Sequence, residues 1–101
     1  MVSVYCFDLD ETLCHTNGTD YSSSIPNQLH INKVNKLFEE GNYIKIFTAR
    51  GSETKINWRE VTIYQLDLWK VQYHELILGK PAADFYIDDK AINSLDFDWE
   101  P

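Results

Sequence analysis

Hydrophobic residues occur along the chain in short runs, which are separated by longer segments of mixed character. Each run has the length of a β-strand and is followed by polar or turn-forming residues, a pattern that predicts strands. The runs are residues 2–9 (VSVYCFDL), 43–49 (YIKIFTA), 74–79 (HELILG) and 84–88 (DFYID). The first run has apolar residues on both faces, which predicts a central position in a covered sheet.

The segments between the runs predict two helices and a loop. The first helix should begin near Pro26 and end before Gly41, because the apolar residues between them repeat at helical spacing. Those residues are Ile31, Val34, Leu37 and Phe38. The stretch 53–73 contains no Gly or Pro and should be mostly helical, whereas residues 16–25 are polar and turn-rich and should form a loop.

This alternation of strands and helices predicts parallel β-α-β units with right-handed crossovers. We therefore expect an α/β protein with a minimal Rossmann-like, three-layer fold and a sheet of four to five mostly parallel strands. The chain has 101 residues, 44% of them hydrophobic, and shows no linker, repeat or low-complexity tract. Residues 1–101 should thus form a single domain with one modest core.

The charge balance limits the partners that the chain can bind. A formal net charge of −7 disfavours non-specific binding to nucleic acid or to an anionic membrane, since both require a basic surface. No segment approaches the roughly 18 consecutive apolar residues of a membrane span, and no signal-peptide pattern opens the chain. Cys6 and Cys14 should be reduced thiols. We expect a cytoplasmic protein.

Polar side chains follow each predicted strand at its carboxyl end, where ligands bind in open α/β sheets. They are Asp8 and Asp10, Thr48 and Arg50, Lys80, and Asp88 with Asp89. If the first strand extends through residue 9, Asp8 and Asp10 point to the same face. Unpaired carboxylates are costly in a core, so this arrangement predicts a site for a metal or a phosphate.

Four sequence motifs, FDLDET, IFTAR, GKP and YIDDK, occur in this order over residues 4–90. Together they resemble the four motifs of the haloacid-dehalogenase superfamily of phosphohydrolases. More narrowly, the combination of TAR with GKPAADFYIDDKAI is similar to small bacterial phosphatases of capsular or surface polysaccharide biosynthesis. The acidic residue two positions after the first Asp of the motif implies hydrolysis of phosphate monoesters, because an alkoxide leaving group needs a proton.

The resemblance implies a role for each acidic residue of the motifs. Asp8 would be the nucleophile that forms an aspartyl phosphate, and Asp10 would be the general acid and base. The implied cofactor is Mg²⁺. It would be held by the Asp8 carboxylate, the Asp10 backbone carbonyl and Asp88, with Asp89 either a further ligand or a hydrogen-bond partner of the ligands.

The remaining motif residues would act on the substrate. By the resemblance, Thr48 would donate a hydrogen bond to the phosphoryl oxygens, and Lys80 would neutralise the nucleophile and the transferring group. Such residue types suit the chemistry, because a carboxylate attacks a dianionic phosphate only when positive charge offsets the repulsion. For Arg50 two interpretations stay open: a contact with the substrate, or an ion pair with nearby carboxylates.

The interval between the first motif and the first predicted helix is too short for a cap domain, so the site should be open. Selectivity for a small phosphorylated metabolite, a sugar or polyol phosphate, would then come from the loop of residues 14–26, from Arg50 and its neighbours, or from a partner subunit. Within the loop, Asp20 and Tyr21 are candidate contacts. A small sheet is expected to have an exposed edge, which dimerisation would cover. Both a monomer and a homodimer stay open.

Two other functions also stay open. The stretch DLDETLCHT is similar to the first motif of the phosphatases that act on the carboxy-terminal tail of RNA polymerase II. The stretch GKPAADFYIDDK, however, does not resemble the later motifs of those enzymes. The other alternative is a non-catalytic module that binds a phosphate or a metal.

Overall fold

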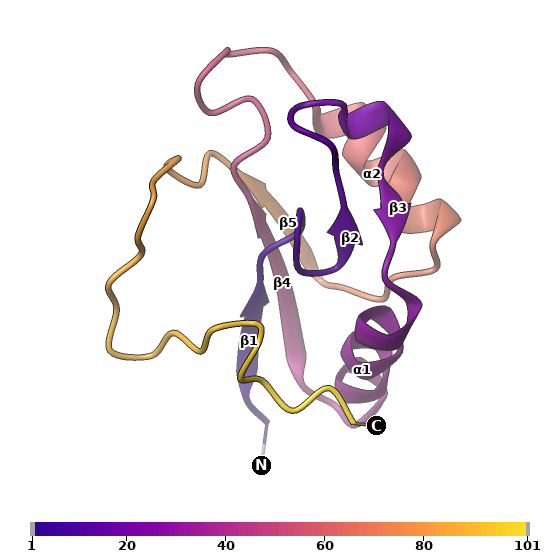
Figure 1. Cartoon of the computed structure of the whole chain (residues 1–101). Helices are drawn as coiled ribbons and strands as arrows, with labels where there is room; N and C mark the ends of the chain where they lie inside the picture. Colours follow the sequence, from indigo (N-terminus) through magenta and orange to yellow (C-terminus); the bar gives the residue numbers. More distant parts are fainter. Residues whose placement is uncertain (1, 101) are drawn as a thin grey trace.

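Three parallel strands form the central sheet, in the order β1, β4, β5 (Figure 1). The computed structural model describes residues 2–100. The sheet consists of β1 (Val4–Phe7), β4 (Tyr43–Thr48) and β5 (Glu75–Leu78), and the helices are α1 (Gln28–Glu39) and α2 (Arg59–Leu68). A small antiparallel pair, β2 (Cys14–His15) and β3 (Ile25–Pro26), flanks the 3-10 turn η1 (Tyr21–Ser23).

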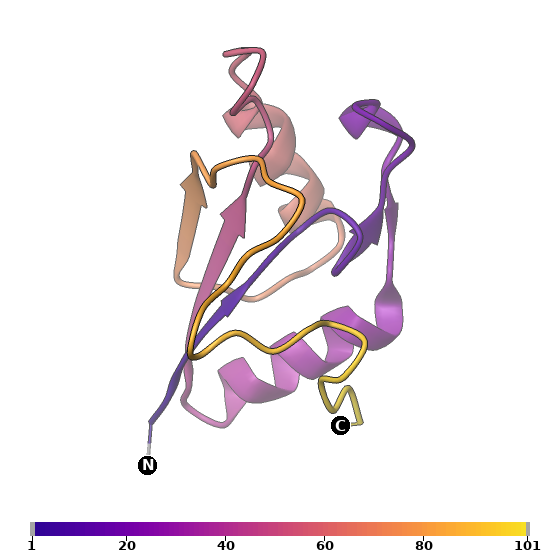
Figure 2. The ribbon, with the colours of Figure 1, turned by 60° about the vertical axis from the view of Figure 1, so that its left-hand side comes forward.

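Both helices lie on the same side of the sheet, and the segment after β5 passes over the other side (Figures 1 and 2). The connections from β1 to β4 and from β4 to β5 both move the same way across the sheet, so two right-handed crossovers place their helices on one face. On β4, alternate side chains are buried against the helices, and those between them are half-buried on the other face. The buried set, Ile44, Ile46 and Thr48, faces the helices. One face of the sheet therefore carries the core.

Helix α1 confirms the expectation from its periodicity. Its apolar residues Ile31, Val34 and Leu37 are buried in the core. At its start the Asn27 side chain accepts a hydrogen bond from the backbone N–H of His30 at 3.1 Å, a cap that stabilises such a helix by about 1 kcal/mol. It ends before Gly41, whose φ of +94° suits the turn into β4.

The prediction of four to five strands was wrong, because within residues 2–100 the parallel sheet has three. Residues 84–88, predicted as the fourth strand, have no regular structure and are exposed, with Phe85 at 83% and Ile87 at 99%. Only residues 79–83 separate this run from the end of β5 at Leu78, whereas a parallel crossover needs about a dozen residues. With both helices on one face, the described chain has two layers and not the predicted three.

The second helix and the first loop also differ from the sequence-based expectation. Of the stretch 53–73, only Arg59–Leu68 is α-helical, and turns with positive φ at Lys55 and Lys70 bound it. The predicted loop over residues 16–25 contains the turn η1 and runs between the paired strands β2 and β3. Within residues 2–100, no helix has the length and hydropathy to cross a membrane.

Candidate functional site

The carboxyl ends of the three parallel strands border a hollow of about 220 Å³. Asp8 and Asp10 reach it from the segment after β1, Arg50 from the segment after β4, and Lys80 from the segment after β5. These four side chains therefore meet at the carboxyl edge of the sheet, as expected from their positions after the predicted strands. Thr16 and Tyr21, from the loop that follows β1, line another side of the hollow.

Asp8 and Lys80 meet across the hollow, with 3.5 Å between the lysine Nζ and the aspartate Oδ1. The backbone N–H of Lys80 donates to the Thr48 carbonyl at 3.1 Å, and the Ser52 hydroxyl donates to the Lys80 carbonyl at 2.7 Å. The ammonium group also lies 4.4 Å from the centre of the Tyr86 ring. These contacts hold Lys80 at the sheet edge and direct its charge towards Asp8.

The Asp8 carboxylate is partly desolvated yet accessible. Burial raises the pKa of Asp8 above its ordinary value, and the charge of Lys80 and a hydrogen bond from the Leu9 backbone N–H only partly offset this rise. The nearby charge of Asp10 raises the pKa further. Because 38% of its side chain is exposed, Asp8 can contact a molecule or cation that enters the hollow.

Asp10 is bound in an ion pair with Arg50, which is only 2% exposed. The guanidinium Nη2 lies 2.9 Å from Asp10 Oδ1 and Nε lies 3.0 Å from Oδ2, and the Thr16 hydroxyl donates to Oδ1 at 2.6 Å. Burial alone would raise the pKa of Asp10, but the hydrogen bonds from Arg50 and Thr16 outweigh it and hold this pKa below its usual range. Asp10 is thus an oriented, ionised carboxylate.

The other N–H groups of Arg50 are also engaged. Nη1 donates to Thr62 Oγ1 at 3.1 Å and to Gln65 Oε1 at 2.6 Å, and Nη2 donates to Ser24 Oγ at 3.2 Å. The guanidinium carbon lies 4.8 Å from the centre of the Tyr21 ring. All five guanidinium donors therefore have partners, so the geometry favours the ion-pair interpretation of Arg50 over a substrate contact.

Thr48 is fully buried at the end of β4 and does not line the hollow. Its hydroxyl oxygen accepts a hydrogen bond from the backbone N–H of Arg50 at 3.1 Å. That bond helps to turn the chain so that the Arg50 side chain points towards Asp10. Its predicted hydrogen bond to a phosphoryl group stays a prediction.

Asp88 and Asp89 do not join the other acidic residues in a single chain. Both are exposed, neither lines the hollow, and Asp88 Oδ1 accepts a hydrogen bond from the Lys90 backbone N–H at 3.0 Å. Within residues 2–100, no three His, Cys, Asp or Glu side chains are arranged to hold a metal ion. One chain thus gathers Asp8, Asp10 and Lys80, whereas the ligand role predicted for Asp88 and Asp89 stays a prediction.

Sequence reasoning missed the residues that hold Arg50 in place. Thr62 and Gln65 are buried on α2 although their side chains are polar, and they point into the site from the second helix. A signal was present: two uncharged polar residues one helical turn apart, with the fully buried Leu66 beside them. Buried polar side chains require partners, and here the partner is a buried guanidinium.

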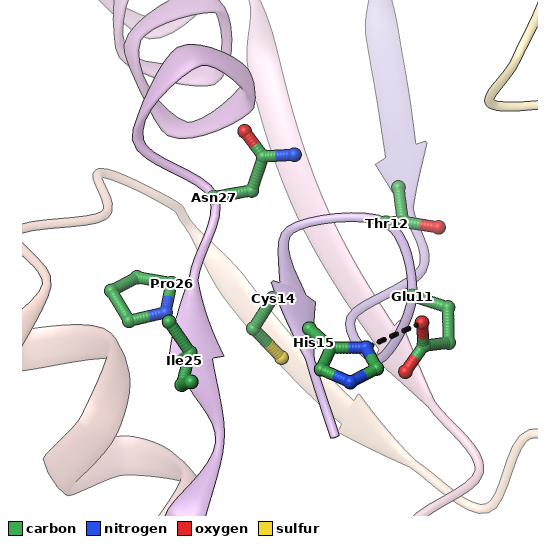
Figure 3. Close-up of a pocket in the computed structure, with 7 residues that line it drawn as sticks. All are labelled: Glu11, Thr12, Cys14, His15, Ile25, Pro26 and Asn27. Atoms are coloured by element: carbon green, nitrogen blue, oxygen red, sulfur yellow. Dashed lines mark hydrogen bonds and ion pairs between the residues drawn. The ribbon is translucent and has the colours of Figure 1, made fainter. Parts of the chain in front are cut away.

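A larger hollow of about 310 Å³ lies between the segment after β1 and β3 (Figure 3). Its titratable groups are less suited to chemistry. His15 Nδ1 pairs with Glu11 Oε2 at 3.0 Å, but both side chains are 61% exposed. Burial, followed by the charge of Asp10, raises the pKa of the Cys14 thiol to about 12, so the thiol is neutral and a poor nucleophile. The smaller hollow is therefore the better candidate site.

Comparisons with known proteins support the fold. A crystal structure of a structural-genomics target from Vibrio cholerae matches with a TM-score of 0.84 and 30% sequence identity, over 93% of this chain and 85% of that chain. A structure of the Pnkp1/Rnl/Hen1 complex matches with a TM-score of 0.61 and 22% identity, over 87% of this chain and 30% of that chain, and shows the fold alone. No protein-family model and no curated protein matches the chain.

Proposed function

We propose that this chain, which belongs to one family with the Vibrio cholerae protein, is a Mg²⁺-dependent phosphatase of the haloacid-dehalogenase type. It would hydrolyse the phosphate monoester of a small sugar or polyol through an aspartyl phosphate. The observation that carries the proposal is the pairing of Asp8 with Lys80 in the same hollow that Asp10 lines. The order of the four motifs supports the type of reaction.

Asp8 is the proposed nucleophile. One of its carboxylate oxygens would attack the phosphorus atom, and the ester P–O bond would break. Lys80, 3.5 Å away, reduces the repulsion between the carboxylate and the dianionic phosphate. Water would then attack the phosphorus of the aspartyl phosphate, releasing inorganic phosphate and regenerating the Asp8 carboxylate.

Asp10 is the proposed proton carrier. It would donate a proton to the departing alkoxide and then accept one from the attacking water. Arg50 and Thr16 lower the pKa of Asp10 in the free protein, but a dianionic phosphate bound beside it would raise this pKa again. The same two residues fix the orientation of the carboxylate, so Arg50 acts as a positioning residue.

The oxygen donors at this site are of the kind that Mg²⁺ prefers. Asp8 would supply a carboxylate oxygen, and Asp10 would supply its backbone carbonyl because Arg50 and Thr16 already engage its side chain. When bound, Mg²⁺ would neutralise negative charge on the phosphoryl oxygens. Asp88 would be the next ligand, and within one chain it lies outside the hollow.

The central test is hydrolysis of p-nitrophenyl phosphate by the wild type and by Asp8→Asn, with Mg²⁺ and with EDTA. We expect Asp8→Asn and EDTA each to reduce kcat by about 10³-fold or more. Asp67→Asn, which changes an exposed carboxylate on α2, is the matched control and should keep wild-type activity. Equal rates for wild type and Asp8→Asn would contradict the proposal and favour a non-catalytic binding module.

Thermal unfolding tests the metal separately from turnover. Millimolar Mg²⁺ should raise the Tm of the wild type, because a bound cation offsets the repulsion between Asp8 and Asp10. Asp8→Asn should largely lose this shift, and Asp67→Asn should keep it. A wild-type Tm that does not respond to Mg²⁺ would count against the metal site. A screen of sugar phosphates beside a phosphoserine peptide would then define the substrate class.

A further inference from the structure

Residues 81–92, which we call the arm, leave the fold after Lys80 and cross the open side of the sheet (Figure 2). In the part of the chain that the structure describes, no backbone–backbone hydrogen bond involves the arm. Its apolar side chains Phe85, Ile87 and Ile92 are exposed. Unpaired backbone and exposed apolar side chains in one segment are typical of a surface that binds another chain.

Strand β1 provides a complementary edge. It pairs with β4 on one side only, and within residues 2–100 no strand lies on its other side. Its apolar residues predicted a central position in the sheet, yet Val4 is 63% exposed. Because β1 leads directly to Asp8, a strand added at this edge would end beside the candidate site.

The arm of the same chain is too short to fill that position in a parallel orientation. Residue 80 still lies beside β4 at the carboxyl edge of the sheet, since its N–H bonds to Thr48. A strand beyond β1 would begin at the opposite edge, roughly 13 Å along the strands and about 14 Å across them, or ~19 Å in all. The four chain steps from Lys80 to Asp84 span at most about 14 Å.

We propose that two copies of the chain exchange their arms, so that residues 84–88 of each copy pair in parallel with β1 of the other. With Asp84 opposite Val4, Asp88 lies opposite Asp8. Phe85 and Ile87 then fall on the face that holds Tyr5 and Phe7, whose rings already pack with Phe97 and Trp99. The same pairing register therefore covers Phe85 and Ile87 and brings Asp88 to the candidate site.

This inference rests on the proposed function in one respect, because the exchange gives each site its missing carboxylate from the other copy. Both ends of the arm stay with their own chain: Lys80 on Thr48, and Phe97 against Phe7, with ring centres 5.9 Å apart. The exchanged part is therefore a loop, and reciprocal exchange closes a two-fold dimer.

The first test is a cross-link between two variants that each carry a single engineered cysteine. One is Val4→Cys and the other is Asp84→Cys, both combined with Cys6→Ser, while buried Cys14 is left in place. After the two are refolded together and oxidised, we expect a covalent dimer of twice the chain mass on a non-reducing gel. Neither variant alone should form it, and neither should Leu95→Cys in place of Asp84→Cys, since Leu95 is exposed but lies outside the paired run.

Two results would overturn the proposed exchange. A monomeric mass in solution together with no cross-link would overturn the exchange. A chain that carries both engineered cysteines and forms an internal disulfide as a monomer would show that the arm instead pairs with β1 of its own chain, which also overturns it. Neither readout depends on catalytic activity.

The second test asks whether the exchanged Asp88 completes the site. Asp8→Asn and Asp88→Asn should each be inactive, but refolding them together should restore about one quarter of wild-type activity, because half of the dimers are mixed and each of these has one complete site. No recovery beside an active wild type would overturn the role of Asp88. A cross-link between the two cysteine variants, beside a wild type that hydrolyses no phosphate, would contradict the proposed function and leave the exchange supported.

Discussion

Two regions of this small protein are built in opposite ways. The Arg50 cluster, which we define as Asp10, Thr16, Arg50, Thr62 and Gln65, is joined by short hydrogen bonds, and all its members are buried except the half-buried Asp10. The arm is exposed and makes no backbone–backbone hydrogen bond within the described residues. The packing of a single chain thus fixes the Arg50 cluster, whereas the proposed contribution of Asp88 depends on where the arm binds.

The difference has an energetic cause. A guanidinium that is 2% exposed is tolerated only when its charge is paired and each N–H has an acceptor, so the Arg50 cluster must be complete before the fold is stable. The arm contains no buried charge: Tyr86 contacts Lys80 and donates a hydrogen bond to the Pro81 carbonyl, but no buried group requires one conformation of the arm. Substitutions in the two regions should therefore differ most in their effect on stability.

Substitution of Arg50 should be the most damaging single change to stability. Arg50→Met leaves Asp10 as a half-buried carboxylate without its partner, and we expect a loss of about 3–5 kcal/mol in the free energy of unfolding. Urea denaturation followed by circular dichroism measures this. Lys90→Met, which removes an exposed cation from the arm, should change stability by less than about 0.5 kcal/mol.

The double variant Asp10→Asn/Arg50→Met sharpens this comparison. It should be more stable than Arg50→Met alone, because the neutral amide no longer leaves an unpaired charge. If Arg50→Met cost less than about 1 kcal/mol, the ion pair would not be the structural element described above.

Removal of an isoleucine side chain should have contrasting effects in the core and in the arm. Ile46 is fully buried and Ile87 is 99% exposed. We expect Ile46→Ala to cost about 2–5 kcal/mol. Ile87→Ala should leave the Tm of a dilute, monomeric sample unchanged but lower it in concentrated samples, where exchanged arms would bury this side chain. Unfolding measured over a range of protein concentrations separates the two cases.

Two glycines provide a smaller test of local strain. A Cβ at Gly51, which has φ of +77° and follows Arg50, would clash with the Ile56 carbonyl oxygen. Gly51→Ala should therefore cost about 2–3 kcal/mol, which corresponds to a Tm decrease of roughly 8–20 °C. Gly79, with φ of +94° and no atom within 4 Å of such a Cβ, is the control. Gly79→Ala should cost only about 1 kcal/mol.

The smallest expected effects concern pH. Folding lowers the pKa of Asp10, so its contribution to stability is complete above the pKa of the unfolded chain and is lost as pH falls through the lower folded value. Folding raises the pKa of Asp8, so its contribution is complete below the unfolded pKa and is lost as pH rises through the higher folded value.

The opposite pH dependences of Asp10 and Asp8 can be measured by replacing each aspartate with asparagine. In metal-free buffer at pH 7, Asp10→Asn should lower the Tm and Asp8→Asn should raise it slightly. Both differences from wild type should shrink as the pH falls below about 4, where the carboxyl groups become protonated. Shifts of the same sign for the two variants at pH 7 would contradict the contrast between the two aspartates.

Much of the fold could be predicted because its determinants are local. The apolar spacing of α1, the runs that became β1, β4 and β5, and the right-handed crossovers are properties of neighbouring residues. They also place Asp8, Asp10 and Lys80 at one edge, as the sequence predicted. The observed convergence therefore follows from strand order and needs no knowledge of side-chain packing.

The remaining differences depend on contacts between distant residues. Residues 84–88 have the composition of a strand, but a strand also needs a neighbour that it can reach, and the link after Lys80 is too short within one chain. The orientation of Arg50 was open in the sequence because it depends on Thr62 and Gln65 on α2. Periodicity alone indicates that these two side chains face the core, but it does not identify their partner.

The anchoring of Arg50 by α2 has a consequence for the evolution of such chains. The guanidinium connects Asp10 with Thr62 and Gln65, two helix positions far from the motif in sequence. In an alignment of family members, we expect these three positions to covary with the arginine of the TAR motif. Lineages that replace the arginine should carry apolar residues at both helix positions, so these two positions should indicate whether an arginine still pairs with Asp10.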